Sequence, residues 1–99
     1  MLCIVKATLA KEHRRFLFAT IDTTNIQQSA AELRFETLHT KLCTLFKQPK
    51  LSIVFEDLNG SKGIIQSDAD VAAAVVHSSK FVSADSSSIV LKLAVEPQL

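Results

Sequence analysis

The feature that most constrains the fold is one long segment of helically spaced apolar residues between groups of short alternating segments. The steps between its apolar residues are four, three, four and three, which places them on one face of a helix. These residues are Ala31, Phe35, Leu38, Leu42 and Leu45. The segment begins with Ser29-Ala30-Ala31-Glu32, which has the S-x-x-E form of a capping box, and Pro49 follows it. We therefore predict a single helix over about residues 30–47.

Alternation of apolar and polar residues predicts a hairpin before this helix. Residues 2–9 place Cys3, Val5 and Ala7 on one face of a strand and Lys6 on the other. Residues 14–21 are rich in aromatic and β-branched side chains and predict the second strand, after a polar turn at residues 11–13. Residues 22–28 are predicted to be a polar connection.

The second half of the chain repeats this pattern with shorter segments. The predicted elements are a strand at 51–55, a tight turn at Asn59-Gly60, a strand at 64–65, a helix at 71–76 entered through Ser67-Asp68-Ala69-Asp70, a flexible loop at 83–88 and a strand at 89–95. The side chain of Lys92 is predicted to point outward from the last strand.

The order of these elements, ββαββαβ, predicts an α+β roll of the ubiquitin-like, β-grasp kind. One long helix would cover one face of a mixed sheet. The chain has 99 residues, of which 47% are hydrophobic, so it can fill one core. We expect a single domain over residues 1–96, with residues 97–99 as a tail or the start of a linker.

The overall composition disfavours several classes of protein. Lys and Arg number 11 against 10 Asp and Glu, a net charge of +1, which does not favour nucleic-acid binding. No apolar run reaches the roughly 18 to 20 residues that span a bilayer. Charge follows the apolar start of the chain at Lys6, which is not the order of a signal peptide. We expect a cytoplasmic protein without membrane insertion.

Cysteine, histidine and glycine, the residue types that most often build catalytic, metal or phosphate sites, occur here without a motif around them. Cys3 and Cys43 lie forty residues apart and suit neither a disulfide framework nor a zinc site. His39 lies four residues before Cys43, but further metal ligands have no evident source in the sequence. Gly60 and Gly63 are the two glycines, too few for a phosphate-binding loop. We therefore expect no catalytic residue, no metal, no cofactor and no enzymatic activity.

The charges divide unevenly between the two halves of the chain. Residues 1–50 carry eight basic and four acidic side chains (+4), and residues 51–99 carry three basic and six acidic ones (−3). The predicted basic face consists of Lys6, Arg14 and Arg15, on the first hairpin. The predicted acidic face consists of Glu56, Asp57, Asp68 and Asp70, which the second hairpin brings together. Complementary faces on one domain allow head-to-tail association into filaments.

Structural roles would also account for these charges. Asp68 and Asp70 lie where acidic side chains cap a helix and interact favourably with its dipole. Arg14 and Arg15 are adjacent on a strand, so their side chains point to opposite faces of the sheet. Both can be accommodated as solvated charges if the strand lies at the edge of the hairpin.

Two segments resemble those of a known family. Residues 55–71, Phe55-Glu56-Asp57-Leu58-Asn59-Gly60-Ser61-Lys62-Gly63-Ile64-Ile65-Gln66-Ser67-Asp68-Ala69-Asp70-Val71, resemble the acidic motif of Phox-and-Bem-one (PB-one) domains. Val5-Lys6-Ala7 is similar to the family's strand with a signature lysine. Residues 11–18 resemble the Arg-Arg-Phe-x-Phe segment of sequestosome-type and Trk-fused-gene-type members. The resemblance spans almost the whole chain and implies a ubiquitin-like module whose basic face docks on the acidic face of another such domain.

The acidic motif departs from the family pattern. Asn59 and Ser61 stand where further carboxylates are usual, and Lys62 and Gly63 stand where an apolar pair is common. The resemblance therefore implies either of two modules. One polymerises through both faces, as in a cytosolic scaffold such as a selective-autophagy receptor. The other is mainly basic-faced and binds the acidic face of a different PB-one domain in a kinase adaptor, a secretory scaffold or an oxidase scaffold.

A ubiquitin-like modifier is a further alternative from another class. Such a modifier is attached through a Gly-Gly tail, whereas this chain ends in Val95-Glu96-Pro97-Gln98-Leu99. If the acidic face does not dock, the outward apolar residues Leu2 and Ile4 are the next candidates for association.

Overall fold

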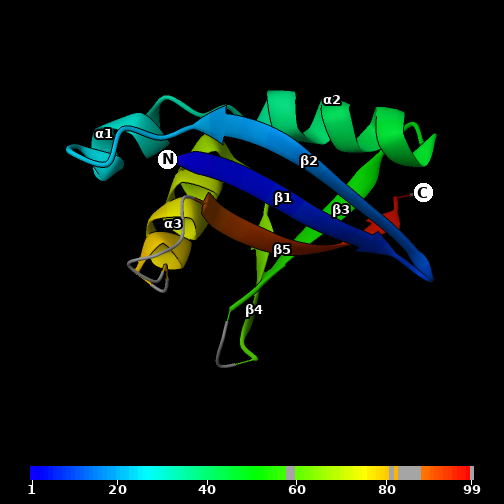
Figure 1. Cartoon of the computed structure of the whole chain (residues 1–99). Coiled ribbons are helices and arrows are strands. Elements are labelled where there is room, and N and C mark those ends of the chain that lie inside the picture. The colour runs from blue at the N-terminus through cyan, green and yellow to red at the C-terminus, as the bar shows by residue number, and fades with distance from the viewer. Residues whose placement is uncertain (58–59, 81, 83–87, 99) are drawn as a thin grey trace.

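The computed structural model describes residues 1–57, 60–80, 82 and 88–98. In this part of the chain, a strand pair, two helices, a second strand pair, a third helix and a last strand follow one another (Figure 1). The elements are β1 (Leu2–Leu9), β2 (Glu12–Thr20), α1 (Ile26–Ala31), α2 (Phe35–Phe46), β3 (Leu51–Glu56), β4 (Lys62–Ile65), α3 (Asp68–Ser79) and β5 (Ser88–Pro97). Asn59 of the predicted turn and residues 83–87 of the predicted loop lie outside the described residues.

The described strands form one mixed sheet in the order β2-β1-β5-β3-β4. The central pair, β1 and β5, is parallel, and the other neighbouring pairs are antiparallel. The mixed α+β sheet predicted from the alternating segments is therefore confirmed. β2 and β4 form the two edges of the sheet, so the two hairpins lie at opposite ends of the strand order.

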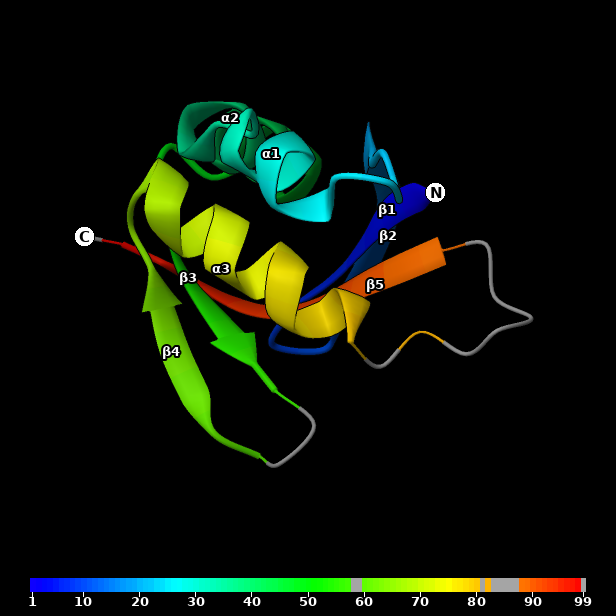
Figure 2. The same cartoon turned by 90° about the vertical axis from the view of Figure 1, so that its left-hand side faces the viewer.

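One face of the sheet is buried against the helices (Figure 2). In β1, Cys3, Val5 and Ala7 are buried while Lys6 is exposed, as the alternation predicts. The helices contribute Leu38, Leu42 and Phe46 from α2 and Val71, Ala74 and Val75 from α3. The opposite face of the sheet, which we call the outer face, carries exposed side chains such as those of Lys6 and Lys92.

The prediction of a single helix over residues 30–47 is wrong, because α1 and α2 are separate helices. Asn25 caps α1, and its side-chain oxygen accepts from the Gln28 N–H at 3.3 Å. Ser29, the predicted cap, lies inside α1, and its hydroxyl accepts from the Asp22 N–H at 3.1 Å. A helix thus occupies part of the segment predicted to be a connection, and Glu32 ends it.

The break between the helices has a tertiary cause. Arg34 is extended, with φ −113° and ψ 132°, and it is followed by the first residue of α2. The Phe35 N–H donates to the Asp68 carboxylate at 2.7 Å, so the first turn of α2 is capped from α3. Of the predicted helical stripe, Leu38 and Leu42 are buried, whereas Ala31 is exposed and belongs to α1.

Candidate functional site

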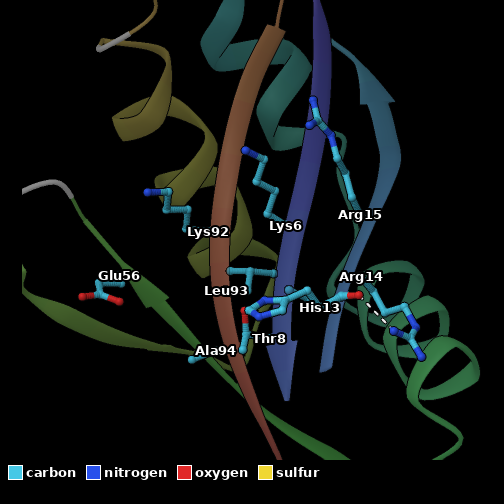
Figure 3. Close-up of a pocket in the computed structure, with 10 residues that line it drawn as sticks. Lys6, Thr8, His13, Arg14, Arg15, Glu56, Lys92, Leu93 and Ala94 are labelled. Carbon is cyan, nitrogen blue, oxygen red and sulfur yellow. Dashed lines mark hydrogen bonds between the residues drawn. The ribbon is translucent and has the colours of Figure 1, made fainter. Parts of the chain in front are cut away.

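Three cationic side chains form a row across the outer face of the sheet (Figure 3). Strand pairing aligns Lys6 of β1 with Arg15 of β2 on one side and with Lys92 of β5 on the other. Residues directly opposite each other on neighbouring strands project from the same face, so the three side chains are neighbours. All three are exposed. We call Arg15, Lys6 and Lys92 the basic row.

The structure separates Arg14 from Arg15. Arg14 is paired with the buried Ala7 and therefore lies on the helix side of β2. Its guanidinium lies 5.7 Å from the centre of the Phe46 ring, donates to the His13 carbonyl at 2.9 Å and approaches Glu12 at 3.5 Å. Because β2 is an edge strand, Arg14 is accommodated there without burial of its charge.

A groove runs along the basic row. Besides Arg14 and the three residues of that row, its lining includes Thr8, His13, Leu93, Ala94 and Glu56. The hydroxyl of Thr8 and Nδ1 of His13 lie 3.1 Å apart, within hydrogen-bonding distance. Glu56, which we predicted for the acidic face, thus lines the groove of the basic row.

Lys92 is not among the residues predicted for the basic face, which are Lys6, Arg14 and Arg15. Its outward direction was evident from the alternation in the last strand, but its position beside Lys6 depends on the parallel pairing of β5 with β1. The signal that could have found Lys92 is the β-grasp topology itself, in which the last strand inserts next to the first.

Asp57 and Asp70 line a second groove between the β3–β4 hairpin and α3, which we call the acidic groove. The Asp57 carboxylate accepts from the Ser61 N–H at 2.9 Å. The Asp70 carboxylate accepts from the Gln66 N–H at 2.9 Å, while the Ser67 hydroxyl accepts from the Asp70 N–H at 3.2 Å. Ser67 is therefore the N-cap of α3, as its capping pattern predicts, whereas the Asp70 carboxylate bonds the N–H of Gln66, one residue before the cap.

The rest of the acidic groove is largely apolar. Its other lining residues are Phe55, Ser61, Lys62, Gly63, Ile64, Ile65, Ala73, Ala74 and His77. The predicted acidic residues Asp57 and Asp70 thus lie together in one groove, whereas Glu56 lines the groove of the basic row.

Asp68, also predicted for the acidic face, contacts α2. Its carboxylate accepts from the Phe35 N–H at 2.7 Å and from the Arg34 guanidinium at 3.0 Å. The backbone hydrogen bond from Phe35, followed by that from Arg34, lowers the pKa of Asp68 below its ordinary value of 3.8. The residue thus caps a neighbouring helix.

The other polar clusters are small. Nε2 of His39 accepts from the Leu51 N–H at 3.2 Å and lies 3.6 Å from the Cys43 sulfur. Among the described residues, no three His, Cys, Asp or Glu side chains are grouped to hold a metal ion. Burial raises the pKa of the Cys3 thiol to about 11, so this thiol is protonated at neutral pH. No described helix is long and apolar enough to cross a membrane.

The two charged surfaces lie toward opposite edges of the sheet. The basic row occupies β2, β1 and β5, and the acidic groove lies at β3, β4 and the start of α3. Such an arrangement leaves both surfaces of one molecule available to two different neighbours at once.

Comparison with known proteins identifies the fold. No family model matches the chain, and no curated protein matches it in sequence. Among solved structures, it is similar to the AtNBR1-PB1 domain, with a TM-score of 0.70 and 19% identity over 98% of each chain. It is also similar to the cryo-EM structure of the AtNBR1-PB1 filament (L-type), with a TM-score of 0.67 and 20% identity over 96% of each chain. The chain therefore has the PB1 fold, the ubiquitin-like α+β fold of the Phox-and-Bem-one domains that its sequence motifs resemble.

Proposed function

We propose that this chain is a protein-interaction module that associates head to tail, its basic row docking on the acidic groove of another copy. The observation that carries the proposal is the placement of two oppositely charged surfaces toward opposite edges of one sheet. A contact between unlike surfaces does not close on itself and so extends into a chain of molecules. The filament formed by the similar AtNBR1-PB1 domain supports this assignment.

The basic row is suited to binding carboxylates. The guanidinium of Arg15 presents a planar set of donors that can hold a carboxylate through two hydrogen bonds. Lys6 on β1 lies beside Arg15, and Lys92 on β5 lies beside Lys6, each as a compact positive charge. Arg14, on the helix side of the edge strand, extends this surface around β2.

In the wider protein, we propose that the module assembles a cytoplasmic scaffold of the selective-autophagy receptor kind. The fold shared with the AtNBR1-PB1 domain supports that setting. The self-association does not depend on this setting, because it uses only the two surfaces of the module.

A second candidate function is a mainly basic-faced module that binds the acidic face of a different PB1 domain. The observation that favours it is the small number of carboxylates in the acidic groove. Of the four predicted acidic residues, Asp57 and Asp70 line this groove, while Asp68 caps α2 and Glu56 lies beside the basic row.

A mixing experiment tests the proposal and separates the two candidates. The first variant, Asp57→Asn/Asp70→Asn, removes the charge of the acidic groove and keeps amide oxygens that can accept from the Ser61 and Gln66 N–H groups. The second variant, Lys6→Ala/Arg15→Ala, removes two cations of the basic row. We expect each variant alone to be monomeric and an equimolar mixture to form a heterodimer, because each supplies one intact surface.

The masses are measured by light scattering and sedimentation against the parent chain. Continued polymerisation of the Asp57→Asn/Asp70→Asn variant would contradict docking through the acidic groove. If the parent chain is itself monomeric, yet binds a PB1 domain with a fuller acidic motif through Lys6 and Arg15, the second candidate is correct.

A further inference from the structure

A group of apolar side chains adjoins the basic row on the outer face of the sheet. Strand pairing aligns Ile4 of β1 with Leu17 of β2 and with Val90 of β5. Each of these residues lies two positions along its strand from a member of the basic row, so both groups share one face. Leu2, two positions before Ile4 on β1, extends the group along that face. We call Leu2, Ile4, Leu17 and Val90 the apolar patch.

The apolar patch is open to solvent. Leu17 is 57% exposed and Leu2 is 39% exposed, whereas Ile4 and Val90 are half-buried. The helices pack against the opposite face of the sheet (Figure 2), which leaves the side chains of Leu2 and Leu17 in contact with water. Among the described residues, Ile64 on β4 is the other exposed large hydrophobic residue. Exposed aliphatic surface is thus concentrated beside the basic row.

The three strands that carry the apolar patch and the basic row have a uniformly basic charge in this region. No Asp or Glu occurs in residues 2–9 of β1, 13–20 of β2 or 88–95 of β5. Glu56 belongs to β3, on the side of Lys92 that is away from Lys6. The apolar patch is therefore bordered by cations alone on these strands, so the surface favours an anionic partner.

The apolar patch lies outside the groove of the basic row. Among the described residues, the lining of that groove includes the basic row but no member of the apolar patch. An acidic peptide seated in the groove would therefore reach the cations and leave Leu2 and Leu17 in water. A broad anionic surface that approaches the whole outer face would cover both groups at once.

We propose that the outer face binds the surface of a membrane that contains acidic phospholipids. The side chains of Leu2 and Leu17 enter the boundary between the headgroups and the acyl chains, and the basic row contacts the anionic headgroups. The chain lies on the bilayer without spanning it. Because the same cations dock on another copy in the proposed function, one molecule uses its basic row for only one of these partners at a time.

Two contributions add in this kind of binding. Each Lys or Arg held near the bilayer is attracted by the negative surface potential, and salt screens this attraction. Apolar side chains that leave water stabilise the bound state without that dependence on salt. Binding should therefore require both the charge of the lipid and the exposed aliphatic side chains, a combination that simple electrostatic adsorption does not require.

The test is sedimentation of the Asp57→Asn/Asp70→Asn chain with lipid vesicles. This variant keeps the outer face and lacks the charge of the acidic groove, so vesicle binding requires no contact between copies. The result therefore does not depend on whether the proposed function is correct. We expect binding to vesicles of phosphatidylcholine with phosphatidylserine to be about tenfold stronger than binding to phosphatidylcholine alone.

Further substitutions in this chain test the two groups separately. Leu17→Ser should weaken vesicle binding about tenfold, and Lys6→Ala about fivefold. Leu17→Met keeps an apolar side chain and should bind within about twofold of the unsubstituted chain. Two matched controls, Ile64→Ser on β4 and Lys80→Ala at the end of α3, remove the same kinds of group elsewhere and should bind as before. Thermal melts check that all variants are folded.

Several results would overturn the inference. Equal binding to both kinds of vesicle, or binding to neither, would show that the outer face does not recognise an acidic membrane. Unchanged binding of Leu17→Ser would show adsorption by charge alone, and an equal loss for Ile64→Ser would show that the apolar patch is not the contact. If Leu17→Ser binds vesicles as before but weakens the heterodimer of the mixing experiment, another copy covers the patch and the membrane does not.

Discussion

The carboxylate of Asp68 illustrates how single residues of similar type take different roles in this chain. Asp57, Asp68 and Asp70 are neighbours in one acidic sequence motif. Asp68 caps α2 through the Phe35 N–H and contacts Arg34, whereas Asp57 and Asp70 line the acidic groove. Both groove residues also accept backbone hydrogen bonds, so substitution by Asn separates loss of charge from loss of local structure.

The lowered pKa of Asp68 predicts a pH dependence of stability. The folded chain holds this carboxyl deprotonated more strongly than the unfolded chain, in which its pKa is near 3.8. The stabilisation is therefore fully present above that pH and is lost as the pH falls through the lower pKa of the folded state. We expect Asp68→Asn to flatten the decrease in melting temperature between about pH 5 and pH 2.

Melting followed by circular dichroism measures this effect. Glu96→Gln on β5 is the control for loss of one exposed negative charge. Parallel pH profiles for Asp68→Asn and the parent chain would show that Asp68 does not stabilise the fold through its charge.

The basic row predicts a role for Lys92 in association. Lys92→Ala removes an exposed cation next to Lys6 without changing the core. Exposed ion pairs contribute about 0.2 to 1 kcal/mol, so we expect binding to the acidic groove to weaken about 1.4- to fivefold. Lys80→Ala, at the end of α3 and outside both grooves, removes the same charge and should have no effect. Equal affinities for the two variants would remove Lys92 from the site.

At the scale of the elements, the caps decide where the helices begin. The segments starting at Ser29 and at Ser67 have similar capping patterns, yet only Ser67 is an N-cap. The difference arises because Asn25 supplies an earlier cap for α1, and because Asp68 supplies a cap for α2 from another element. The first turn of α2 therefore depends on the docking of α3.

Removal of the α3 cap should destabilise the domain measurably. We expect Ser67→Ala to lower the free energy of unfolding by about 0.5 to 2 kcal/mol, because the Asp70 N–H loses its acceptor. Urea denaturation measures the change. Ser67→Asp, which retains a capping oxygen, should remain close to the parent chain. A loss as large for Asp as for Ala would mean that the hydroxyl stabilises the protein in some other way.

At the scale of the whole molecule, the strand order places the two charged surfaces apart. The basic row lies on β2, β1 and β5, and the acidic groove lies at β4, the other edge of the sheet. Since the surfaces differ, self-association has a direction, and its extent depends on charge on both sides.

The proposed assembly should therefore shrink with increasing salt. Raising the ionic strength to about 0.5 M reduces the screening length well below the ~8 Å of physiological solutions and weakens the ion pairs. We expect the mean mass in sedimentation experiments to fall steeply over this range at constant protein concentration. The mass should be restored on dialysis back to low salt at the same protein concentration, which distinguishes screening from unfolding. An unchanged mass would contradict an electrostatic contact.

The sequence by itself determined the strands, the N-cap of α3, the mixed sheet and the outward direction of Lys6. These features follow from the spacing of apolar residues, every two residues in a strand and every 3.6 in a helix, and from capping within a few residues. Both depend only on residues that are close in the sequence. Only the tertiary structure divided the predicted long helix, paired Lys92 with Lys6 and turned Arg14 toward Phe46. It also placed the four predicted acidic residues in three different places: the acidic groove, the groove of the basic row and the start of α2. These outcomes depend on contacts between elements distant in the chain, which no local pattern records.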